Sequence, residues 1–124
     1  MTFRNNLYFI DSVSRTEADV TYRLHLNAGH IIYAAHFPGE PITTGVCLLQ
    51  MGVELLSDAV GSELEIDTVK NVKFLSVLHP EGQTVEVRVH HMNVDGNAVK
   101  AQTDFTAGEV PVAKMSLLCR KTAK

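Results

Sequence analysis

The sequence has few of the features that mark several common protein classes. It has no tryptophan and two cysteines in 124 residues, too few for a fold built on disulfide bonds. Cys47 lies in an apolar run and Cys119 lies near the C-terminal end, so we expect both to be reduced core thiols. Lys and Arg number 11 against 14 Asp and Glu, a net charge of -3. This balance argues against nucleic-acid binding, because contacts to phosphates need a basic surface.

Long apolar segments are also missing. No stretch approaches the ~20 apolar residues of a membrane-spanning helix, and the first residues, MTFRNNLYFID, contain no apolar core of a signal peptide. No linker, repeat or low-complexity segment divides the chain. We therefore expect one domain over residues 1–124, without a membrane span and located in the cytoplasm.

The C-terminal half shows the alternation of apolar and polar residues that is typical of strands. Residues 85–90 and 99–105 alternate in this way. Asp95-Gly96 predicts a tight turn between them, and Gly108-Glu109 predicts another before a last strand from Val110 to Arg120. The sequence therefore predicts a meander of three antiparallel strands.

Further strands are expected upstream, on either side of a long helix. Residues 22–27 alternate clearly, 69–78 form another expected strand, and a short apolar run at 7–10 indicates a first one. Between them, residues 46–60 are apolar over nearly the whole helical circumference, which is typical of a buried helix. Thr44 is suited to cap its start and Gly61 to end it. The pattern predicts an α+β fold in which five or six antiparallel strands wrap one helix.

This apolar helix carries three polar side chains at helical spacing: Gln50, Glu54 and Ser57. One interpretation is that this face meets solvent where the sheet leaves the helix uncovered. The other is a functional one, because a partly buried carboxylate usually has a partner or a task.

His36 is the natural counterpart of these side chains. The turn Phe37-Pro38-Gly39 follows it, and Gly45 stands where the helix begins. Glycine lets a backbone N–H approach a ligand closely, and the positive end of the helix dipole favours an oxyanion there. A base, an oxyanion donor and polar helix residues together suit removal of a proton next to a carbonyl group.

The segment over residues 36–46 resembles the signature of the β-hydroxyacyl-acyl-carrier-protein dehydratases of fatty-acid synthesis, and the similarity extends over the whole chain. In this sequence it reads His36-Phe37-Pro38-Gly39-Glu40-Pro41-Ile42-Thr43-Thr44-Gly45-Val46. The resemblance implies the hotdog fold, in which a curved antiparallel sheet wraps one central helix.

The resemblance also implies roles for the residues of the motif. His36 would remove the α-proton of a 3-hydroxyacyl thioester, and the N–H of Gly45 would polarise the thioester carbonyl. Phe37, Pro38, Gly39 and Val46 would belong to the substrate-binding surface. No metal or organic cofactor is expected.

The family works as a dimer or a trimer of dimers, with active sites between subunits. A homodimer or higher homo-oligomer is therefore expected, and an oligomer with a homologue is an alternative. The expected partner is an acyl carrier protein that bears the acyl chain on its phosphopantetheine arm.

One departure from the family pattern concerns the carboxylate that helps the hydroxyl group leave. It stands fourteen positions after the histidine, where this chain has Gln50, and Glu54 follows one turn later, where the family tends to have glutamine. Three interpretations follow. The chain is a dehydratase of fatty-acid synthesis, or of a polyene or polyketide pathway, in which Gln50 and Glu54 share that role. It is a subunit that binds acyl thioesters and pairs with an active homologue. Or it is a thioesterase.

Overall fold

The structure, a computed structural model, describes residues 2–35 and 39–122. It contains six strands and two helices in these residues: β1 Tyr8–Arg15, β2 Val20–Leu26, α1 Ile31–Ala35, α2 Gly45–Val60, β3 Leu64–Phe74, β4 Thr84–Asp95, β5 Ala98–Ala107 and β6 Val110–Lys121. The order of these elements agrees with the expected α+β class.

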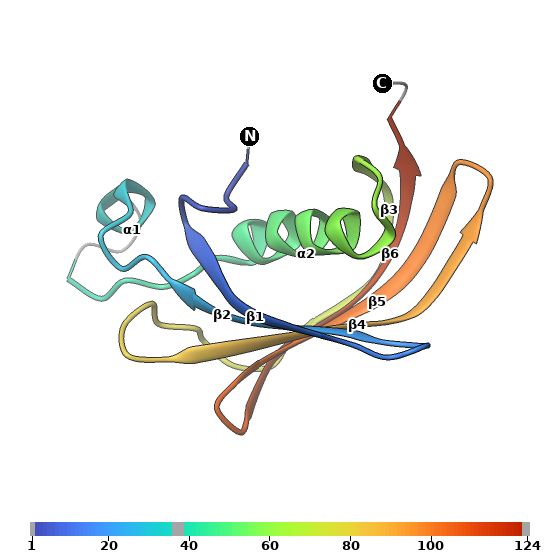
Figure 1. The fold of residues 1–124 in the computed structure, drawn as a ribbon. Coiled ribbons are helices and arrows are strands. Elements are labelled where there is room, and N and C mark those ends of the chain that lie inside the picture. The colour runs from blue at the N-terminus through green and yellow to red at the C-terminus, as the bar shows by residue number, and fades with distance from the viewer. Residues whose placement is uncertain (1, 36–38, 123–124) are drawn as a thin grey trace.

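The strands form one antiparallel sheet that curves around α2. Its strand order is β1-β2-β4-β5-β6-β3, so β1 and β3 are the two edges. The predicted meander is confirmed as β4, β5 and β6, and its turns place Gly96 and Gly108 at φ of 60° and 61°, where a side chain would be strained. Figure 1 shows α2 lying along the concave side of the sheet.

The core lies between α2 and this concave face. Strand residues at alternate positions, among them Val85, Val87 and Val89, are fully buried, because successive side chains point to opposite faces of a sheet. Met51 and Leu55 of α2 are fully buried as well. Gly52 brings the helix close to β5, since a Cβ built there would lie 3.4 Å from the Thr103 hydroxyl.

Three elements differ from the sequence predictions. β3 begins at Leu64 and ends at Phe74, earlier than the predicted 69–78, because residues 64–74 pair with β6. After Phe74, both Leu75 and Ser76 donate to the carbonyl of Val112, so the regular ladder stops. β1 runs on to Arg15 instead of ending near residue 10. The five-residue α1 was not predicted, since one turn carries too little periodic pattern.

Two further expectations concern the cysteines and the membrane. Cys47 and Cys119 are both free and buried, as expected, and burial and then Asp67 raise the pKa of the Cys119 thiol to about 11. Within residues 2–35 and 39–122, no helix has the length and apolar character needed to cross a membrane.

The buried hydroxyl of Thr103 yields a stability prediction. Thr103 is fully buried and its hydroxyl has no hydrogen-bond partner among the described residues. Thr103→Val should therefore raise the free energy of unfolding by about 1 kcal/mol, because it removes an unpaired polar atom at nearly constant volume. Urea unfolding followed by circular dichroism measures the change. Thr103→Ser, which keeps the hydroxyl and loses a methyl group, should be destabilised; a destabilised Thr103→Val would contradict the prediction.

Candidate active site

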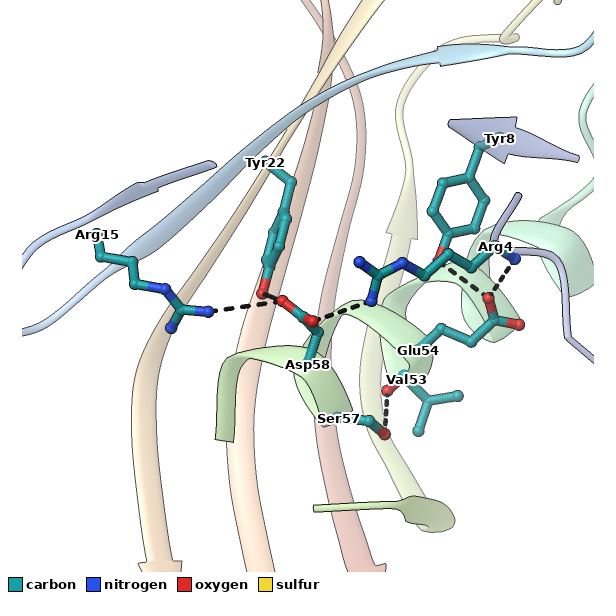
Figure 2. A network of polar contacts seen from close by, with 8 residues as sticks. All are labelled: Arg4, Tyr8, Arg15, Tyr22, Val53, Glu54, Ser57 and Asp58. Carbon is teal, nitrogen blue, oxygen red and sulfur yellow. Dashed lines mark hydrogen bonds and ion pairs between the residues drawn. The ribbon is translucent and has the colours of Figure 1, made fainter. Parts of the chain in front are cut away.

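The polar residues of α2 lie together on one face of the helix, as their spacing predicts. Gln50, Glu54 and Ser57 are all partly buried. The predicted caps are confirmed: the Thr44 hydroxyl accepts from the N–H of Cys47, and Gly61 ends the helix in the left-handed region at φ 74°. This polar face is contacted by the first residues of the chain (Figure 2).

The Glu54 carboxylate accepts four hydrogen bonds. Oε1 accepts from the N–H of Arg4 at 2.8 Å and from the hydroxyl of Tyr8 at 2.9 Å. Oε2 accepts from the N–H of Phe3 at 2.8 Å and from the Gln50 amide at 2.8 Å. Two bonds on each oxygen occupy the roughly four acceptor positions of a carboxylate. Glu54 thus joins the N-terminal residues to α2.

Gln50 contacts Glu54 through a defined end of its amide group. Its Nε2 donates to Glu54 Oε2, as the i,i+4 spacing on a helix allows. An ionised carboxylate can only accept, so the amide nitrogen and not the oxygen must face it. The expected partnership of Gln50 and Glu54 is therefore direct within one chain, and whether either acts on a substrate stays a prediction.

An open pocket of about 820 Å³ lies beside this polar face. α2 contributes Gln50, Glu54, Ser57 and Asp58 to its wall, and the start of β3 and the N-terminal residues complete it. Ser57 is engaged in the fold itself, because its hydroxyl donates to the carbonyl of Val53 and accepts from the N–H of Leu64.

Asp58 extends the polar face by one more turn and was not singled out from the sequence. Figure 2 shows it beside three partners. The Tyr22 hydroxyl donates to it at 2.6 Å and Arg4 at 2.9 Å, and Arg15 forms an ion pair with it at 3.6 Å. Asp58 stands four residues after Glu54 and eight after Gln50, so the helical spacing places it on the same face of α2 and could have identified it from the sequence. Arg4 contacts both carboxylates of the helix, Glu54 through its backbone and Asp58 through its guanidinium.

These contacts shift the acidities of the groups involved. Burial raises the pKa of Asp58, but the hydrogen bonds from Tyr22 and Arg4 and the charges of Arg4 and Arg15 outweigh it, so the net pKa is lowered. Burial, then the Glu54 carboxylate, raises the pKa of Tyr8. Burial, then the Asp58 hydrogen bond, raises that of Tyr22. Both tyrosines therefore remain protonated and able to donate at neutral pH.

The loop before α2 is described only in part. His36, Phe37 and Pro38 lie outside the described residues, so their predicted roles are not tested. Gly39 has a φ of 91°, which a turn can adopt readily only with glycine. At the helix start Val46 is 76% exposed. Gly45 lies against the ring of Phe74, since a Cβ built there would be 2.6 Å from the ring.

The residues described here do not bring together three or more His, Cys, Asp or Glu side chains that could hold a metal ion.

Comparison with known proteins begins with the sequence. Residues 12–113 match the ApeI-like family, which is described as ApeI dehydratase. None of the curated proteins matches the chain.

Solved structures share the fold. The dehydratase heterocomplex ApeI:P from Xenorhabdus doucetiae aligns with 17% identity and a TM-score of 0.71, over 90% of this chain and 97% of the other. A protein from Erwinia carotovora aligns with 16% identity and a TM-score of 0.67, over 94% and 95%. A hypothetical thioesterase with coenzyme A from Streptococcus pneumoniae aligns with 11% identity and a TM-score of 0.67, over 93% and 85%. At these identities the similarity shows the fold alone, and it confirms the expected hotdog architecture.

The carboxylate of Asp58 gives a pH-dependent stability prediction. Its pKa in the folded protein lies below the ordinary value of 3.8, so its contribution is present above that value and is lost as the pH falls through the folded pKa. At neutral pH, Asp58→Asn should lower the free energy of unfolding by about 1 kcal/mol. Urea unfolding at neutral and acidic pH should show the two proteins converging in acid.

The matched control is Asp67→Asn. Asp67 is an exposed carboxylate that pairs with Arg120, and such pairs contribute little. A difference between Asp58→Asn and wild type that persists unchanged below the ordinary Asp pKa would contradict the assignment.

Proposed function

The chain belongs to the ApeI-like family of dehydratases, and on this premise we propose that it eliminates water from a 3-hydroxyacyl thioester to give the 2-enoyl thioester. The observation that carries the proposal is the Gln50–Glu54 pair on the wall of the pocket beside α2. Gln50 stands fourteen residues after His36.

The reaction needs a base, an oxyanion donor and help for the leaving hydroxyl group. His36 takes the proton from Cα, which places negative charge on the thioester oxygen. The N–H of Gly45 stabilises that charge, aided by the positive end of the α2 dipole. The electron pair then forms the double bond while the Cβ–O bond breaks and the oxygen leaves, after protonation, as water. Gln50 and Glu54 take the place of the carboxylate that usually assists this step.

The substrate class follows from the same resemblance. We propose an acyl chain carried on the phosphopantetheine arm of an acyl carrier protein, within fatty-acid synthesis or a related polyene or polyketide pathway. Phe37, Pro38, Gly39 and Val46 form the surface beside the thioester. The exposed Val46 supports this placement, because an apolar side chain at a helix start can pack against an acyl chain.

The protein functions as an oligomer in this proposal. β3 is an edge strand of the sheet, and a row of unpaired backbone groups at an edge favours pairing with another strand. Val69 and Phe74 on this strand, followed by Leu75 and Val77, are exposed apolar residues. Pairing along β3 in a homodimer or a larger homo-oligomer would cover them, in keeping with the resemblance, which implies active sites between subunits.

Dehydratase activity is tested directly with purified protein and a 3-hydroxyacyl carrier protein. The 2-enoyl thioester should form, and His36→Ala should lower the rate about 100-fold or more, the usual contribution of a positioned general base. The matched control is His25→Ala, because His25 is an exposed strand residue paired with Asp11. Product analysis by mass spectrometry distinguishes loss of water from hydrolysis. An active His36→Ala variant would overturn the base assignment, and release of free thiol would indicate a thioesterase.

A second function is a subunit that binds the thioester and completes the site of a homologue. It is favoured by the Glu54 carboxylate, whose acceptor positions are taken by its own chain, so that it is poorly placed to give up a proton. The structural relative from Xenorhabdus doucetiae is itself a dehydratase heterocomplex.

This alternative predicts no turnover by the isolated protein and turnover after mixing with a homologous dehydratase subunit. Size-exclusion chromatography of the mixture should then show one complex of both chains. Activity of the isolated protein would contradict it.

A further inference from the structure

The Gln50–Glu54 contact is part of a larger arrangement that includes the start of the chain. Three of the four donors to Glu54 come from residues 3–8, which we call the N-terminal turn: the N–H groups of Phe3 and Arg4 and the hydroxyl of Tyr8. The fourth donor is Gln50. One carboxylate therefore links the N-terminal turn to the amide at the proposed site of elimination.

The N-terminal turn is itself well held. The N–H of Leu7 donates to the carbonyl of Phe3 at 2.7 Å, and the N–H of Asn5 donates to that of Tyr8 at 2.8 Å. The Phe3 side chain is buried in the core. Figure 2 shows the Tyr8 hydroxyl and the Arg4 backbone reaching the same side chain, Glu54. The turn thus holds the carboxylate in one place, because its donors cannot follow a moving acceptor without breaking these bonds.

This arrangement requires a carboxylate at position 54. A glutamine there would offer one oxygen and an NH₂ group that only donates. It would leave at least one of the backbone N–H groups of Phe3 and Arg4, or the Tyr8 hydroxyl, facing another donor. With Glu54 as acceptor, the residue one turn earlier must donate, and Gln50 does so. The exchanged order of the two residues is therefore a consequence of how the N-terminal turn is anchored.

We propose that Glu54 and the N-terminal turn act as a positioning unit for the Gln50 amide, so that Glu54 contributes to the reaction through Gln50 and not on the substrate. Because Nε2 faces Glu54, the amide oxygen lies at the opposite end of the group. Its two lone pairs allow it to accept the hydrogen of the 3-hydroxyl beside another bond that it accepts. An amide gives up no proton, so the proton that leaves Cα for His36 passes from His36 to the departing oxygen. One proton is taken and returned, the Cβ–O bond breaks, and water leaves.

Turnover of three variants tests this inference, which rests on the proposed function. Tyr8→Phe and Glu54→Gln should each lower kcat about tenfold to 100-fold, the effect of a misplaced catalytic group, with KM nearly unchanged. The matched control is Tyr22→Phe. Its hydroxyl binds the next carboxylate of the helix, Asp58, and its loss should leave kcat near wild type. Equal losses of kcat in Tyr8→Phe and Tyr22→Phe would overturn the inference.

Non-additivity gives a sharper test than single variants. If Glu54 acts through Gln50, Glu54→Gln should cost nothing further in a Gln50→Ala background, because the group that it positions is already gone. If Glu54 is itself a proton donor, the two losses should combine. Combined losses would therefore overturn the positioning role.

A measurement that needs no activity separates failure of this inference from failure of the proposed function. In ¹⁵N-labelled protein, the two side-chain NH₂ protons of Gln50 should be well separated and protected from exchange in wild type and Tyr22→Phe. They should lose both properties in Glu54→Gln. Signals that do not respond to Glu54→Gln overturn the inference. Signals that respond as expected in a protein without turnover support the positioning of Gln50 and overturn the dehydratase function.

Discussion

The carboxylate of Glu54 is the contact on which the arrangement of this molecule's polar face depends. It accepts from two backbone N–H groups, a tyrosine hydroxyl and a glutamine amide. Backbone N–H groups that are buried without an acceptor cost about as much free energy as a lost hydrogen bond. This acceptor therefore helps to hold the start of the chain against the central helix. The same carboxylate also accepts from Gln50 Nε2 and so sets the orientation of that amide.

Placing two carboxylates one turn apart on a helix creates repulsion that the surroundings must offset. The carboxylate of Glu54 accepts hydrogen bonds from uncharged groups. The carboxylate of Asp58 instead forms ion pairs with Arg4 and Arg15 and accepts from the Tyr22 hydroxyl. These contacts lower the pKa of Asp58. Burial first, and then the contacts with the two carboxylates, raises the pKa values of Tyr8 and Tyr22. Arg4 connects the two groups, since its backbone and its side chain serve different carboxylates.

The remaining part of the proposed site depends on assembly. The strand β3 carries exposed apolar residues at an edge of the sheet, and the proposed roles of His36 and of the Gln50–Glu54 pair require two chains. In this proposal one subunit supplies one wall of the pocket, and the identity of its neighbour decides whether the site is complete. This is why a dehydratase and a partner subunit of a dehydratase are both consistent with the same fold.

Local patterns in the sequence determined most of the fold. The alternation of apolar and polar residues at 85–90 and 99–105 was enough to predict β4 and β5, because each strand has one buried and one outer face. Thr44 and Gly61 were enough to predict where α2 begins and ends, since helix capping depends on residues that are close in the chain. β3 was misplaced because most of its side chains are exposed, so little alternation marks where it starts.

The sequence also contains part of the candidate site, since it shows the motif around His36 and the helical spacing of Gln50 and Glu54. What Glu54 contacts beyond Gln50 was decided by the tertiary structure alone. Phe3 and Arg4 lie about fifty positions away from Glu54, and hydrogen bonds over such a separation form only when the fold brings both ends together.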